Sequence, residues 1–102
     1  MQSYGEYAGV MKALADETRL RILDMLSCGQ MCACKILEAF DITQPTLSYH
    51  MKILTRADLV TGVRDGAWMH YSLNQDSIEG LKGFISELTS PKDGCLCGEC
   101  ER

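Results

Sequence analysis

Apolar residues recur every three or four positions along most of the chain, a spacing typical of amphipathic helices. The pattern predicts a first helix over residues 4–14 and a short third helix within residues 31–40. Between them, a second helix is expected to begin after the favourable N-cap residue Asp16 and to end before Cys28 and Gly29. The apolar side chains predicted for these helices are Val10, Met11, Leu14, Leu20, Leu23, Leu26, Ile36, Leu37 and Phe40.

The segment ITQPTLSYHMKILTRADLV at residues 42–60 predicts a fourth helix with two distinct faces. Thr43 is a favourable N-cap residue, and Pro45 suits the first helical turn because no N–H partner is needed there. The apolar residues at positions i, i+4 and i+7 are Leu47, Met51 and Leu54. One face of this helix is therefore expected to be buried and the other to remain polar.

The apolar period then changes from about 3.6 residues to about two, which indicates strands. Strands are predicted over residues 60–64 and 67–73, and Asp65-Gly66 between them is predicted to form a two-residue hairpin turn. A last amphipathic helix is expected within residues 76–90. Its apolar residues are Ile78, Leu81, Phe84, Ile85 and Leu88. The predicted fold class is mainly α with a β-hairpin wing (α+β), a winged helix-turn-helix.

The length and composition indicate one domain with one modest core. The chain has 102 residues, of which 46% are hydrophobic and 24% charged, as in ordinary globular proteins. We expect a folded domain over residues 1–90 and a flexible, Cys-rich tail over residues 91–102. No secretory leader and no apolar run of the roughly 20 residues that a membrane span needs are found, so a cytoplasmic protein without a membrane partner is expected.

Six cysteines are many for a chain of this size. In a reducing compartment, clustered thiols more often bind metal or perform redox chemistry than form a disulfide framework. Two of them, Cys32 and Cys34, stand one residue apart at the start of the third predicted helix. Cys28 is instead predicted to be a small buried apolar residue. His50 is expected at a groove edge or in the core and His70 in the hairpin, neither as a metal ligand.

The charge distribution favours DNA as a partner of the fourth helix, although the chain as a whole has a formal net charge of −4. Between residues 43 and 64, three cations face one anion, Asp58. The cations are Lys52, Arg56 and Arg64. The C-terminal quarter holds many of the acidic residues: Asp76, Glu79, Glu87, Asp93, Glu99 and Glu101. The acidic charge is therefore separated along the chain from the predicted DNA-binding face.

The polar face of the fourth helix has the side chains that a DNA-reading helix uses. Gln44 matches adenine, and Thr46 and Ser48 suit base edges or phosphates. Lys52 and Arg56 neutralise phosphate charge. A merely solvated face is the alternative, but the helix just upstream and the hairpin downstream favour docking in the major groove. Because a monomer would make few phosphate contacts, we expect a homodimer, formed through the first and last helices, on double-stranded operator DNA.

Four segments of the chain are ADETRLRIL, the Cys-x-Cys of MCACKILEAF, DITQPTLSYHMKIL and VRDGAWMHYSLN. Their order and spacing, over residues 10 to 88, resemble the ArsR/SmtB family of bacterial metal-responsive repressors. The resemblance implies a homodimeric winged-helix repressor that binds operator DNA when metal-free and releases it when a toxic metal or metalloid binds. The positions that match the family's base and phosphate contacts are Gln44, Thr46, Ser48 and Tyr49, supported by Lys52 and the wing's Arg64. Tyr49 departs from the His common there, which bears on operator sequence preference.

In the arsenic- and cadmium-type members that this chain resembles, a Cys-x-Cys in the first helix of the helix-turn-helix supplies two soft thiolate ligands. Cys32 and Cys34 occupy that place, but the third Cys of the arsenite-type pattern is replaced by Leu37. The missing sulfurs are expected from the tail of the same or the partner subunit, giving three or four in all. These tail residues are Cys95, Cys97 and Cys100. An exposed tail without this use, or an independent metal scavenger, is the alternative.

The implied inducer is As(III), with Cd, Pb or Zn ions as alternatives, and no organic cofactor is expected. Three thiolates in a pyramid suit As(III), and four in a tetrahedron suit Zn or Cd. A thiol redox or persulfide sensor on the same fold is a further alternative, because Cys97 and Cys100 form a Cys-x-x-Cys motif. A thiol oxidoreductase is disfavoured, because the β-α-β context of such a motif is absent. We therefore expect a repressor and not an enzyme.

Overall fold

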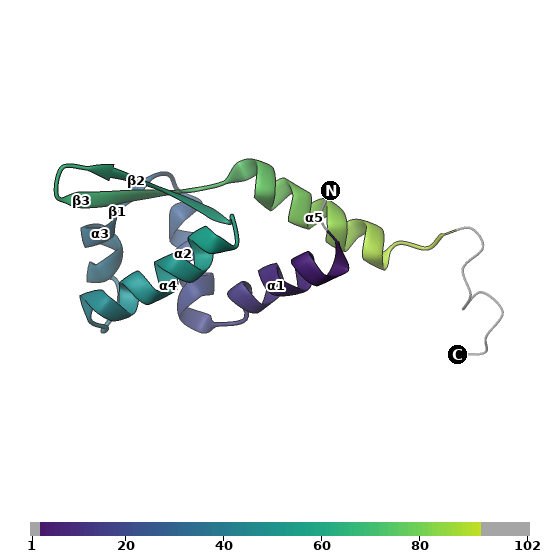
Figure 1. Ribbon diagram of the computed structural model, residues 1–102, viewed down its shortest axis with the longest axis horizontal. Coiled ribbons are helices and arrows are strands. Elements are labelled where there is room, and N and C mark those ends of the chain that lie inside the picture. The colour runs from purple at the N-terminus through teal and green to yellow at the C-terminus, as the bar shows by residue number, and fades with distance from the viewer. Residues whose placement is uncertain (1–2, 93–102) are drawn as a thin grey trace.

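The structure, a computed structural model, describes residues 3–92. Its elements are α1 (Tyr4–Leu14), α2 (Glu17–Leu26), β1 (Met31–Cys32), α3 (Ala33–Glu38), α4 (Gln44–Arg56), β2 (Val60–Asp65), β3 (Trp68–Leu73) and α5 (Gln75–Thr89). Figure 1 shows α2, α3 and α4 beneath the β2–β3 hairpin at one end of the molecule, and α1 and α5 extending toward the other. No helix within the described residues is long and apolar enough to cross a membrane.

Side-chain caps determine where α2 and α4 begin, as the sequence predicts. Asp16 accepts a hydrogen bond from the Arg19 N–H at 3.0 Å. Thr43 accepts one from the Thr46 N–H at 3.3 Å. Each such cap contributes about 1 kcal/mol to stability. Pro45 lies in the first turn of α4, where its missing N–H costs nothing. Both predicted N-caps and the predicted position of the proline are therefore confirmed.

The buried face of α4 is confirmed, and that of α2 is partly corrected. Leu47, Met51 and Leu54 are all at most 3% exposed and join the hydrophobic core. On α2 the fully buried residues are Ile22 and Leu26, which lie one helical turn apart. Leu20, which the apolar spacing placed on the same face, is 51% exposed. It lies about 200° around the helix from Ile22, on the side away from the core.

The hairpin forms as predicted, but its turn lies one residue later. Asp65 pairs with Trp68, so the two turn residues are Gly66 and Ala67 and not Asp65-Gly66. Gly66 has φ = +66°, at the first central position of the turn. This position of a type II′ hairpin turn favours glycine, because other residues are strained at positive φ. The requirement for glycine at this place therefore sets the register of the wing.

A short strand that the apolar pattern did not predict ties the Cys-x-Cys segment to the wing. β1 pairs antiparallel with β3, and the sheet order is β1-β3-β2. Met31 lies opposite Tyr71, and Cys32 lies opposite His70. Two residues are too few to show a period of two, so this segment resembles the start of a helix. His70 lies in the hairpin, as predicted.

The end of α4 contains a backbone conformation that disfavours its own residue. Asp58 has φ = +63° and is the only residue other than glycine with positive φ within residues 3–92. Its N–H donates to the carbonyl of Thr55 at 3.0 Å. The next N–H, of Leu59, donates to the carbonyl of Leu54 at 3.1 Å. This pair of bonds is the Schellman motif, in which the left-handed position is usually glycine.

Asp58→Gly is therefore expected to raise the free energy of unfolding by about 0.5–1 kcal/mol. Glycine adopts the left-handed conformation without strain, and the change also removes a negative charge beside the helix C-terminus. Urea unfolding followed by circular dichroism measures the effect. Asp41→Gly is the matched control, because Asp41 is also an exposed aspartate but has no positive φ. An Asp58→Gly variant no more stable than the parent would contradict this account.

Candidate DNA interface and thiol site

The face of α4 opposite its buried residues is exposed. The side chains on α4 that are predicted to contact DNA all lie in solvent: Gln44, Thr46, Ser48, Tyr49 and Lys52. Tyr49 is 60% exposed, a large fraction for an aromatic ring. The Thr43 hydroxyl donates to Thr46 Oγ1 at 3.0 Å, which leaves the Thr46 hydroxyl proton available for an outside acceptor. The face thus offers hydrogen-bonding groups and a cation to a partner.

The wing, α3 and α4 line an open pocket in which predicted DNA contacts and a predicted metal ligand meet. Arg64 lies on β2 and is exposed. The pocket has a volume of about 150 Å³, and its lining includes Arg64, Gln44, Ser48 and Cys34. The structure therefore brings Cys34 together with three of the six predicted DNA contacts. The other three, Thr46, Tyr49 and Lys52, lie on α4 outside the pocket lining.

Cys32 and Cys34 form a close thiol pair at the start of α3. Cys32 is the N-cap of α3, and its Sγ accepts a hydrogen bond from the Cys34 N–H at 3.4 Å. The two Sγ atoms are 2.7 Å apart. The hydrogen bond from the Cys34 thiol lowers the pKa of Cys32, and the same bond raises the pKa of Cys34. Of the two thiols, Cys32 therefore loses its proton more readily, and the thiolate is the form that binds soft metals.

The remaining cysteines differ from expectation or lie outside the described residues. Cys28 is exposed and not buried. The helix before it ends at Leu26, and the chain then turns at Gly29, with φ = +136°, which keeps Cys28 off the core. The predicted tail ligands, which lie outside residues 3–92, are Cys95, Cys97 and Cys100. Within residues 3–92, no cluster of three or more His, Cys, Asp or Glu side chains is placed to hold a metal ion.

A contact that the sequence analysis missed fixes α4 against the α1–α2 turn. Arg19 Nη1 lies 3.0 Å from His50 Nδ1, and Arg19 Nε donates to the carbonyl of Ala13 at 2.6 Å. The Asp16 carboxylate lies 3.9 Å from the same His50 nitrogen. Hydrogen bonding from the Arg19 N–H, with the nearby charge of Arg19, lowers the pKa of Asp16. His50 is partly buried. Its contact with Arg19 therefore joins α2 to α4 and helps to orient α4.

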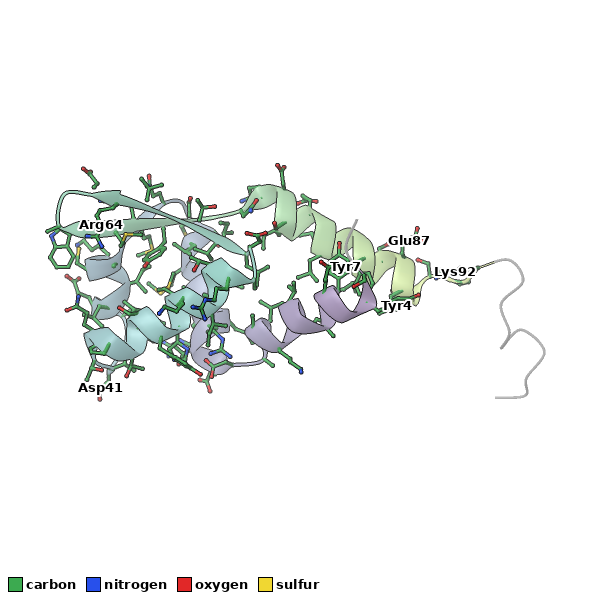
Figure 2. All side chains as sticks on the ribbon, viewed as in Figure 1. Tyr4, Tyr7, Asp41, Arg64, Glu87 and Lys92 are labelled. Carbon is green, nitrogen blue, oxygen red and sulfur yellow. The ribbon has the colours of Figure 1, made fainter. Side chains whose placement is uncertain are left out.

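A second exposed face lies on α1 and α5, away from the wing. The rings of Tyr7 and Phe84 stack with centroids 4.0 Å apart, which joins the two helices. Around this contact, large apolar side chains are exposed: Tyr4, Ile85 and Leu88, at 77%, 42% and 53%. Figure 2 shows Tyr4 and Tyr7 at the end of the molecule opposite Arg64. The candidate DNA interface and this apolar face are therefore well separated.

Comparison with known proteins decides the family. The family model described as bacterial regulatory protein, arsR family, matches residues 16–61. The chain is 42% identical to the arsenical resistance operon repressor of Staphylococcus xylosus, over 96% of this chain and 99% of that protein. The chain belongs to the arsR family. The resemblance of its four segments to that family is thereby confirmed, and as an arsR-family member the chain is a DNA-binding transcriptional repressor.

Solved structures of arsR-family proteins share this fold. The crystal structure of an ArsR family transcriptional regulator matches with a TM-score of 0.77 and 24% identity, over 86% of this chain and 92% of that one. The solution structure of a homodimeric winged helix-turn-helix DNA-binding domain from Mycobacterium bovis matches with a TM-score of 0.68 and 28% identity, over 85% and 86%. The winged helix-turn-helix fold is confirmed. The individual DNA contacts and sulfur ligands stay predictions.

Proposed function

We propose that two copies of this arsR-family chain bind operator DNA in the cytoplasm and release it when As(III) binds the Cys32–Cys34 pair. The observation that carries this proposal is the pocket in which Cys34 lies beside predicted DNA contacts of the helix and the wing: Gln44, Ser48 and Arg64. A metalloid on the thiols would stand next to groups that the operator needs. Inducer and DNA would then compete for one region of the protein.

The β1–β3 pairing supplies a mechanical route for this competition. Cys32 ends β1, caps α3 and accepts a hydrogen bond from the Cys34 thiol. An arsenic atom bound to both sulfurs would displace the Cys34 thiol proton and with it the hydrogen bond between the two sulfurs. The N-cap of α3 and strand β1 both include Cys32, so they would have to move together. Because β1 is hydrogen-bonded to β3, the adjustment would move the wing relative to α4. Such a shift changes the spacing between the groups that contact the groove and the backbone.

As(III) is the proposed inducer, and the name of the Staphylococcus xylosus relative supports it. The thiol pair supplies two soft ligands, which also suit Cd, Pb or Zn ions. Arsenite, in which As(III) carries only oxygen ligands in solution, prefers three sulfur ligands in a protein. We propose that the third sulfur comes from the tail of residues 91–102, from the same or the partner subunit. The candidates are Cys95, Cys97 and Cys100. No organic cofactor is needed for this chemistry.

A thiol redox or persulfide sensor is the second candidate function. The 2.7 Å separation of the two Sγ atoms and the lowered pKa of Cys32 favour oxidation of this pair. Hydrogen peroxide would take two electrons and two protons from the two thiols, forming a disulfide and two waters. Operator release by peroxide, but not by arsenite with excess reductant, would favour this function over the metalloid sensor.

Gln44→Ala and Ser48→Ala are each expected to weaken operator binding by about 1–3 kcal/mol, because each removes a hydrogen bond to a base or phosphate. The fold is expected to be unchanged, since both side chains are exposed. Fluorescence anisotropy on a duplex selected from a random library measures the affinity at two salt concentrations. Gln75→Ala, an exposed residue of α5, is the matched control. If both variants bind like the control, α4 is not the reading helix.

A further inference from the structure

The contact between Arg19 and His50 fixes the protonation state of the histidine. Arg19 Nη1 lies 3.0 Å from His50 Nδ1. A guanidinium nitrogen donates hydrogen bonds and does not accept them, so Nδ1 must be the acceptor at this distance and carries no proton. His50 is therefore a neutral imidazole with its proton on Nε2. Its side chain is only 12% exposed, so the contact is largely shielded from water.

Arg19 is itself held in place, which makes it a fixed reference for α4. Its Nε donates to the carbonyl of Ala13 at 2.6 Å, near the end of α1. Its backbone N–H donates to the Asp16 carboxylate that caps α2. The rigid, planar guanidinium therefore connects the end of α1 to α4 through the His50 ring.

The His50 ring also contacts an exposed side chain of the candidate DNA interface. The rings of His50 and Tyr49 meet in a T-shaped arrangement, with centroids 5.4 Å apart and planes at 65°. Tyr49 is one of the predicted DNA contacts, and a shift of the His50 ring changes the surface against which its ring rests. His50 thus links the α2 contact on one side to a predicted DNA contact on the other.

A second partner for the same imidazole nitrogen lies nearby. The Asp16 carboxylate is 3.9 Å from His50 Nδ1. Hydrogen bonding from the Arg19 N–H lowers the pKa of Asp16, so this carboxylate is ionised near neutral pH. Further charged side chains of α1 and of α4 and its end line the groove beside Arg19: Glu6, Lys12, Arg56 and Asp58. Asp16 is the anion placed to receive a proton carried on His50 Nδ1.

A proton on Nδ1 would make the present contact unfavourable. Two donors would face each other, and two positive charges would stand about 3.0 Å apart. The ring would then have to move from Arg19 toward Asp16. Histidine is the side chain whose charge ordinarily changes between about pH 5 and pH 8, so solvent supplies this proton within a mild pH range.

We propose that His50 is a positioning residue of the reading helix, and that its protonation weakens operator binding. Neutral His50 is bonded to Arg19 and holds α4 and the Tyr49 ring as DNA requires. Protonated His50 exchanges Arg19 for Asp16, which changes the orientation of α4 against α2. This inference rests on α4 as the DNA-reading helix of the proposed function, but not on its thiol site.

The test is operator affinity by fluorescence anisotropy at about pH 7.5 and about pH 5.5, on the full-length, reduced chain without metalloid. The parent is expected to lose about three- to tenfold in affinity at the lower pH, the size of one hydrogen bond. His50→Asn places an amide oxygen where Nδ1 accepts, and it does not titrate. This variant should bind like the parent at the higher pH and lose less than about twofold at the lower one.

His70→Asn is the matched control, because His70 is the other of the two histidines and lies on the wing. It should keep the parent's pH-dependent loss. Stronger binding of the parent at the lower pH would mean that the added charge attracts DNA, and it would overturn the proposal. An equal loss in His50→Asn would also overturn it. Circular dichroism at both pH values shows whether each variant keeps its fold.

A measurement without DNA separates this inference from the proposed function. Long-range proton–nitrogen correlation spectra distinguish the two imidazole tautomers, and His50 is expected to carry its proton on Nε2 at the higher pH. A proton on Nδ1 there would refute the Arg19 bond. If the Nε2 tautomer is found but Gln44→Ala binds operator DNA like Gln75→Ala, α4 is not the reading helix, and the proposed DNA contacts fail although the Arg19–His50 bond stands.

Discussion

Cys32→Ser is expected to bind operator DNA like the parent, within about twofold, and to keep it when arsenite is added. The parent is expected to lose about 5- to 150-fold in operator affinity on binding arsenite, the usual range for coupled sites. The serine hydroxyl preserves the N-cap acceptor of α3, so the reading helix and wing should stay in place. A neutral hydroxyl is a poor ligand for a soft metalloid, so the inducer is lost.

Fluorescence anisotropy of operator DNA with and without arsenite measures this effect. Cys34→Ser should behave in the same way, because it removes the other sulfur of the pair. Cys28→Ser is the matched control, since Cys28 is an exposed thiol near the pair in sequence but outside it. Linkage also requires DNA to weaken arsenite binding by the same factor as arsenite weakens DNA binding. If Cys32→Ser released operator DNA at the same arsenite concentration as the parent, the thiol site would be refuted.

Leu88→Glu is expected to convert a dimer to monomers and to weaken operator binding by about 100-fold or more. Leu88 is 53% exposed on α5, one helical turn after Phe84, whose ring contacts Tyr4 of α1, and Ile85 is 42% exposed. Exposed apolar patches of this kind mark contact surfaces, and a charge in such a contact is left without water. A dimer that contacts two half-sites binds DNA about 10²- to 10⁴-fold more tightly than a monomer that contacts one, so loss of the partner subunit should weaken DNA binding strongly.

Sedimentation velocity measures the oligomeric state, and anisotropy on the same samples measures operator affinity. Ser86→Glu is the matched control, because it adds the same charge to the same helix at an exposed position about 160° around the helix from Leu88. Circular dichroism tests that both variants keep their helices. A dimeric Leu88→Glu variant with the parent's affinity would show that the two copies meet on another surface.

Much of the fold was predictable, because its signals act over a few residues. The caps at Asp16 and Thr43 and the buried row of α4 follow from neighbours within one or two helical turns. The hairpin was likewise predictable from the apolar period of two in its strands and from Gly66 in its turn. The polar face of α4 and the Cys-x-Cys were recognisable for the same reason. The sequence by itself therefore determined the order of the helices and of the two hairpin strands, the fold class and the candidate residues for the proposed chemistry.

Only the tertiary structure decided how these pieces meet. β1 exists because β3 lies beside it, and nothing local to Met31 and Cys32 indicates that partner. The exposure of Cys28 depends on where the chain leaves α2, and the contact of Arg19 with His50 joins residues 31 apart. The pocket between α3, α4 and the wing is likewise formed by segments distant in sequence. Contacts across the chain are set by packing of whole elements, which local periodicity does not encode.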